Sequence, residues 1–87
     1  MATRRITLST SDWTQLSEAN VELIVTREDG SVAWRMDAGK PDAADTLGHP
    51  LTDLTPLTGT TRLPVWGRAV TAEGGATTVI VSTGPAA

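Results

Sequence analysis

Apolar and polar residues alternate through several short segments of this chain, which is typical of strands with one buried face. The clearest case is residues 21–27, where Val21, Leu23 and Val25 share one face and Ile24 is the apolar exception on the other. The same character recurs in four further segments, residues 5–9, 32–36, 63–71 and 77–82. Pro64 has no amide proton to donate, so its strand is expected to start there or to lie at an edge.

The segment between residues 27 and 32 predicts a tight turn. Its Asp29-Gly30 pair is favoured in type I′ turns because both central residues need positive φ. On the returning strand, Val32, Trp34 and Met36 share one face. We therefore expect an antiparallel hairpin over residues 21–36.

Two interpretations are open for residues 11–15. Asp12 followed three residues later by Gln15 resembles a capping box, which would start one helical turn running to about Ala19. Alternatively, the segment is extended and Trp13 closes the end of a sandwich. We favour the extended form, because so short a helix has little stability of its own.

The middle of the chain, residues 37–62, is rich in glycine and proline and has no sustained periodicity. Leu51, Leu54 and Leu57 recur every third residue, but Pro56 would break a helix there. These leucines are expected to hold an irregular loop against the edge of the core. Because so long a loop is uncommon in a small domain, we expect it to contact a partner or to serve function.

Together these segments predict an all-β protein, a small antiparallel β-sandwich or partly closed barrel of five to six short strands. We expect one domain over residues 1–87, with an N-terminal arm (1–4), a turn at 73–75 and a C-terminal tail (83–87). A chain of 87 residues buries only about 60% of its surface on folding. With no cysteine to brace so thin a core, neighbouring subunits are one means of completing it.

Charge and composition exclude several classes of function. The net charge is −3 and the arginines are scattered, which disfavours nucleic-acid binding. No apolar run approaches the ~18 residues of a membrane span, and no apolar segment typical of a signal peptide follows the N-terminus. We expect synthesis in the cytoplasm and no membrane association.

His49 is the strongest catalytic candidate, with Asp45 and Asp53 four residues to either side. On a helix these three would share a face and could bind a metal or transfer protons. Gly48 and Pro50 flank the histidine and exclude such a helix, so we expect an exposed loop histidine.

Other catalytic and metal-binding patterns are weak. Asp37, Asp42 and Asp45 lack the ligand spacing and central glycine of an EF-hand loop. The serines show no nucleophile elbow, and cysteine chemistry is excluded. We therefore expect no enzymatic activity, no cofactor and no metal site.

Three tryptophans are the only aromatic residues. Trp34 alternates with apolar neighbours and is expected in the core, whereas Trp66 has the parity of an outward or interface residue. Core or interface packing is the favoured role for all three, because an indole buries so much area. Exposed indoles that stack on sugars are the alternative.

Several stretches resemble the small β-sandwich virion proteins of tailed bacteriophages and gene-transfer particles. They are Asp-Trp-Thr-Gln at 12–15, Asp-Gly-Ser-Val at 29–32, Leu-Pro-Val-Trp-Gly-Arg-Ala at 63–69 and the closing Thr-Val-Ile-Val strand. In such proteins an early tryptophan after a polar turn and a late aromatic-x-Arg-Ala strand recur. Trp13 and residues 66–69 occupy those places.

The resemblance implies a structural virion component that decorates the head or forms part of a vertex, spike base or collar. It would assemble as a homo-oligomer, such as a trimer, and contact other virion proteins such as the major capsid protein. A glycan-binding module using Trp66 and Trp13 and a protein-binding adaptor are the alternatives. The residues that we expect at an interface are Trp13, Trp66, Arg68, Leu51, Leu54, Leu57, Arg4 and Arg5.

Overall fold

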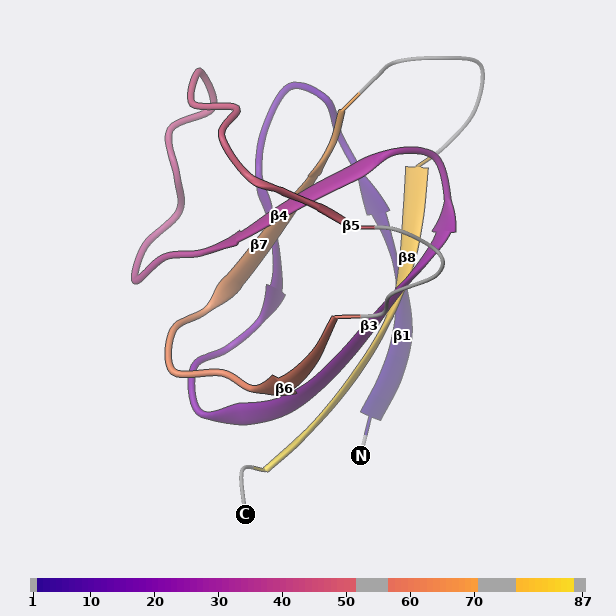
Figure 1. Cartoon of the computed structure of the whole chain (residues 1–87), viewed down its shortest axis with the longest axis vertical. Coiled ribbons are helices and arrows are strands. Elements are labelled where there is room, and N and C mark those ends of the chain that lie inside the picture. The colour runs from indigo at the N-terminus through magenta and orange to yellow at the C-terminus, as the bar shows by residue number, and fades with distance from the viewer. Residues whose placement is uncertain (1, 52–56, 71–76, 86–87) are drawn as a thin grey trace.

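The computed structural model describes residues 2–51, 57–70 and 77–85, and within them eight strands form two antiparallel sheets of four strands. The sheets pack together as a sandwich (Figure 1). The first sheet has the order β1 (Ala2–Leu8), β8 (Thr77–Pro85), β3 (Val21–Asp29) and β6 (Leu57–Thr60). The second has the order β2 (Thr14–Ser17), β7 (Val65–Ala69), β4 (Val32–Met36) and β5 (His49–Leu51). The predicted all-β fold is confirmed, in its sandwich form and with more strands than expected.

The core lies between the sheets and is built from the alternating positions that the sequence predicts. On β3, Leu23 and Val25 are buried while Ile24 between them is 41% exposed. From the other sheet, Leu16 and Val65 are fully enclosed. The buried cluster comprises Leu8, Leu16, Leu23, Val25, Val32, Leu51, Val65, Ala69, Val79 and Val81. Aliphatic side chains thus form the whole of this cluster.

The predicted hairpin over residues 21–36 is wrong, although both of its strands exist. β3 pairs with β8 and β6, whereas β4 pairs with β7 and β5 in the opposite sheet. Gly30 has φ +79°, but Asp29 is not in the left-handed region, so the two-residue pattern of a type I′ turn is absent. A register shift between Arg27 and Asp29 interrupts the ladder just before the turn. The chain therefore crosses from one sheet to the other at this corner.

The predicted long loop over residues 37–62 contains two short strands. β5 and β6 lie at the edges of different sheets, so the irregular segment in front of them ends at Gly48. Leu51 is buried and Leu57 packs against the core, as the expected anchoring role requires. Leu54 lies outside the described residues.

The extended interpretation of residues 11–15 is correct in substance. β2 begins at Thr14, and Trp13 just before it is 3% exposed. Its indole Nε1 donates a hydrogen bond to the backbone oxygen of Asp45, 2.8 Å away. This bond and the ion pair between Lys40 and Asp12 anchor the start of β2 to the segment that precedes β5.

Parts of the expected arm and tail belong to the first sheet. Ala2 on β1 pairs with Thr83 on β8, and Pro85 pairs with Val21 on β3. The strand predicted around Pro64 begins just after it and lies centrally between β2 and β4. The turn expected at residues 73–75 is outside the described residues. Across the ranges that are described, no helix is long and apolar enough to cross a membrane.

Candidate functional site

The outer face of the second sheet is covered by residues 37–48, and this cover encloses three of the expected interface residues. Trp13, Trp66 and Arg68 are 3%, 9% and 5% exposed. Residues 66 and 68 point away from the intersheet core, as the parity of Trp66 predicted. The segment folded over them hides them from solvent, so they are not available to a partner.

Polar contacts hold this cover in place. The Arg68 guanidinium donates hydrogen bonds to the backbone oxygens of Ala43, at 2.9 Å, and of Thr10. It also lies 5.3 Å from the centroid of the Trp13 ring. The indole Nε1 of Trp66 donates to the backbone oxygen of Asp37 at 3.1 Å. Because these donors are satisfied within the domain, the cluster stabilises the fold.

Arg4 and Arg5, both expected at an interface, direct their side chains to different parts of the molecule. Arg5 forms two hydrogen bonds to the Glu28 carboxylate, at 2.7 and 2.8 Å. This pairing lowers the pKa of Glu28, with the hydrogen bond from Arg5 as the largest cause and one from Thr78 next. Arg4 points the other way and donates to the backbone oxygen of Leu16 at 3.3 Å, which links β1 to β2 across the two sheets.

A first hollow, of about 490 Å³, lies at the β4–β5 edge of the second sheet and includes Gly48 in its lining. Trp34 and His49 are directly opposite each other on these strands, and their ring centroids are 4.9 Å apart. Met36 and Leu47 also line it and are 40% and 78% exposed. Trp34 packs partly against the core, as predicted, and its remaining surface contributes to this hollow.

Arg35 fixes the charged rim of the same hollow. Its guanidinium donates to the carboxylates of Asp37 and Asp45, at 2.5 and 2.9 Å, and to the backbone oxygen of Leu47 at 3.2 Å. The pKa of Asp45 is lowered chiefly by the Arg35 hydrogen bond and then by the Leu47 amide. The rim therefore holds one cation between two carboxylates.

The same contacts involve the residues that the sequence offered as candidates for metal binding or acid–base chemistry. Asp37 and Asp45 are both committed to Arg35, while Asp42 accepts a hydrogen bond from the Ala44 amide at 3.0 Å. His49 packs against Trp34 with the two rings tilted by 42°, and Asp53 is outside the described residues. Within the described ranges, no three histidine, cysteine, aspartate or glutamate side chains are grouped so that they could hold a metal ion.

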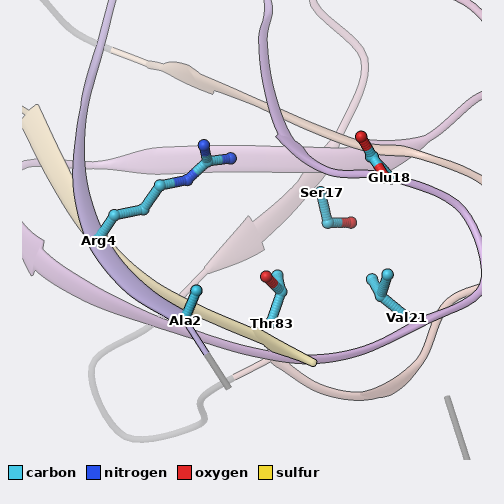
Figure 2. Close-up of a pocket in the computed structure, with 6 residues that line it drawn as sticks. All are labelled: Ala2, Arg4, Ser17, Glu18, Val21 and Thr83. Carbon is cyan, nitrogen blue, oxygen red and sulfur yellow. The ribbon is translucent and has the colours of Figure 1, made fainter. Parts of the chain in front are cut away.

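A second hollow, of about 290 Å³, has mixed polar and apolar walls and lies at one end of the sandwich (Figure 2). Its lining comes from β1, β8, the last residue of β2, the first residue of β3 and the connection between those two strands, and comprises Ala2, Arg4, Ser17, Glu18, Val21 and Thr83. Ser17 is 3% exposed, and among the described residues its hydroxyl has no hydrogen-bond partner. The sequence alone had no means of indicating Ser17, because its burial depends on how the two sheets meet.

No family model, curated protein or solved structure matches this chain, so its function has to be inferred from the chemistry of these surfaces.

Proposed function

We propose that this protein is a non-enzymatic structural component of a tailed-phage or phage-like virion, which joins neighbouring subunits on the head or its vertices through the edges of its sandwich. The virion assignment rests on the resemblance of residues 12–15, 29–32 and 63–69 described above. The mode of action rests on one observation of the structure, the exposed apolar side chains at the β4–β5 edge. Neighbouring copies of this chain and a capsid protein are the proposed partners.

The β4–β5 edge has the properties of a contact surface. Leu47 and Met36 expose large apolar side chains beside the Trp34–His49 pair. Contiguous exposed apolar surface on a small protein marks an interaction site. In the described part of the chain, β5 pairs only with β4, so its outer edge also has backbone groups to offer. Together these features favour burial against a partner.

The energetics suit a protein that acts in many copies. Burying a few hundred Å² of apolar surface contributes about 25 cal/mol per Å², which makes a single contact weak. Repeated contacts in a symmetric particle act together, and their combined strength far exceeds that of one. A small domain of this kind would therefore be held firmly on a capsid although each contact is modest.

Light scattering coupled to size exclusion tests the contact surface. We expect the wild-type chain to form an oligomer, and Leu47→Asp to shift it towards the monomer because a charge would be buried at the interface. Leu63→Asp is the matched control, since Leu63 is also exposed, at 42%, but does not line the hollow. A wild-type chain that stays monomeric at every concentration and does not bind particles would count against the proposal.

The virion assignment is tested separately by the genes that flank this one. Capsid, portal or terminase genes beside it, together with recovery of the protein in purified particles, are the expected results. A neighbourhood of unrelated metabolic genes and no recovery with particles would overturn the assignment while leaving the contact surface intact.

Glycan binding is the second candidate, and the Trp34 hollow is the observation that favours it. A half-buried indole beside two carboxylates and a guanidinium can stack on a sugar ring and hydrogen-bond its hydroxyls. This moves the candidate site from Trp66 and Trp13, which are buried, to Trp34. Tryptophan fluorescence that changes saturably with an oligosaccharide in the wild type but not in Trp34→Ala would support this alternative.

A further inference from the structure

The pocket at the end of the sandwich places two exposed charged side chains, Arg4 and Glu18, beside the buried hydroxyl of Ser17. The Arg4 guanidinium and the Glu18 carboxylate lie on one side of it, and Ala2 and Thr83 lie on the other (Figure 2). No hydrogen bond or ion pair joins Arg4 to Glu18 in the described structure. The two charges therefore do not neutralise each other, and Arg4 instead donates to the backbone oxygen of Leu16.

Ser17 contributes a hydroxyl to this pocket. Its side chain is almost fully buried, and its hydroxyl has no hydrogen-bond partner among the described residues. A buried hydroxyl without a hydrogen-bond partner is costly to the fold. Because its oxygen has almost no accessible surface, the hydroxyl gains a partner from a polar ligand in this pocket once the Ser17 side chain turns towards it.

The arrangement of charges defines the ligand. Arg4 can only donate hydrogen bonds, and an ionised Glu18 can only accept them. A ligand complementary to both carries an acceptor anion and a donor cation a short distance apart. Val21 and Ala2 add apolar wall to the same pocket, and its volume of about 290 Å³ suits a small molecule.

We propose that this pocket binds a zwitterionic α-amino acid. The ligand carboxylate accepts hydrogen bonds from the Arg4 guanidinium and the Ser17 hydroxyl, the ammonium donates to Glu18, and the side chain rests on Val21. This site shares no residue with the β4–β5 edge, so a test of ligand binding here is independent of the test of the proposed function.

The test is a titration of the uniformly ¹⁵N-labelled full chain with L-alanine, followed by amide chemical shifts. We expect saturable shifts centred on residues 4, 17 and 18, with a Kd of about 1 mM, because the charges are partly hydrated. N-acetylalanine lacks the ammonium and alanine amide lacks the carboxylate, so each should bind at least about 10-fold more weakly.

Variants assign the roles of the individual side chains. Arg4→Gln and Glu18→Gln are each expected to weaken L-alanine binding about 10-fold, and Ser17→Ala to weaken it while leaving the chain folded. Arg5→Gln and Glu22→Gln are matched controls, because these exposed charges are outside the pocket lining and should leave the Kd unchanged.

Three results would overturn the proposal. The first is no saturable shift with L-alanine in the folded wild type. The second is acetate binding as tightly as L-alanine, which would show a simple carboxylate site. The third is an unchanged or improved L-alanine affinity in Glu18→Gln.

Discussion

Among single residues, Arg68 contributes most plainly to the fold. It lies on the central strand β7, is 5% exposed, and donates to backbone oxygens of two separate segments at residues 10 and 43. Its guanidinium also faces the ring of Trp13. The planar, multiply donating guanidinium suits this position because one group reaches several acceptors.

Replacing this side chain should destabilise the protein. Arg68→Met leaves the backbone oxygens of Thr10 and Ala43 without their donor, and we expect a loss of about 2–4 kcal/mol in the free energy of unfolding. Arg68→Lys should also destabilise the protein, since one ammonium group cannot reproduce the several N–H donors of the planar guanidinium. Urea denaturation monitored by tryptophan fluorescence gives both values. Arg62→Met, at an exposed position, should change little, and equal stability of the two methionine variants would contradict this role.

Sequence reasoning identified Trp13 as a residue that closes the end of the sandwich, but it gave no indication that a cover encloses Trp66 and Arg68. The parity of Trp66 correctly predicted that it faces away from the intersheet core. An outward residue on a central strand is exposed unless something covers it, and the covering segment at residues 37–48 has no periodicity to reveal its position. Side-chain alternation can be read from neighbouring residues in the sequence, whereas the position of a covering segment depends on contacts between distant residues.

At the scale of elements, the packing of β7 against β2 depends on a glycine. Gly67 lies opposite Thr14 in the ladder, and a Cβ at this position would lie 2.9 Å from Leu16 Cδ1. Leu16 is fully buried, so it has little room to move. The absence of a side chain at residue 67 therefore allows Leu16 to fill the core.

Gly67→Ala should accordingly destabilise the sandwich by about 1–3 kcal/mol, measured by chemical denaturation. Gly39→Ala is the control, because a Cβ there meets nothing within 4 Å, and its effect should stay within about 0.5 kcal/mol. In a double-mutant cycle with Leu16→Ala, the cost of the alanine at 67 should shrink, since the clashing methyl group is gone. An unchanged cost in that background would argue against the steric explanation.

The corner between β3 and β4 supplies a second test at this scale. Gly30 has φ +79°, and a Cβ on it would lie 2.3 Å from Thr77 Oγ1 and 2.8 Å from Thr77 Cβ. Gly59 also has positive φ, at +144°, but open space around it. Both alanine variants incur backbone strain, whereas only Gly30→Ala adds a collision. We expect Gly30→Ala to lower the thermal midpoint clearly more than Gly59→Ala, and the reverse order would refute the close packing of this corner against β8.

For the whole molecule, surface ion pairs make stability depend on pH in the acid range. The pKa values of Asp12, Glu28 and Asp45 are lowered in the fold, chiefly by hydrogen bonds from Lys40, Arg5 and Arg35. A carboxyl group whose pKa is lower in the folded state stabilises it above the unfolded pKa. That contribution is lost as the pH falls through the folded pKa. All three groups act in the same direction.

We therefore expect a constant thermal midpoint near neutral pH and a decline once the pH falls below the ordinary carboxyl value of about 4. Asp45→Asn should flatten part of this decline, because one of the titrating groups is gone. High salt should weaken the effect, since the pairs are exposed to solvent. A melting series from pH 7 to the acid range measures it, and a midpoint that rises on acidification would contradict the sign.

The alternation of apolar and polar residues by itself determined that the chain forms strands and which face of each is apolar. It did so because side chains on a strand alternate between two faces, a property of the local backbone. Residues 21–27 and 32–36 are strands for that reason, and Leu51 and Leu57 are anchors because apolar side chains at a sheet edge pack inward.

Only the tertiary structure decided which strands pair and what covers them. A short turn containing Asp29-Gly30 can close a hairpin or lead to the opposite sheet, and burial of both strands against distant partners favoured the second. The same long-range packing enclosed Trp66 and Arg68 and left Trp34 at an open edge. It also placed Arg4, Ser17 and Glu18 around one pocket, from positions whose separation along the chain gives no indication that they meet.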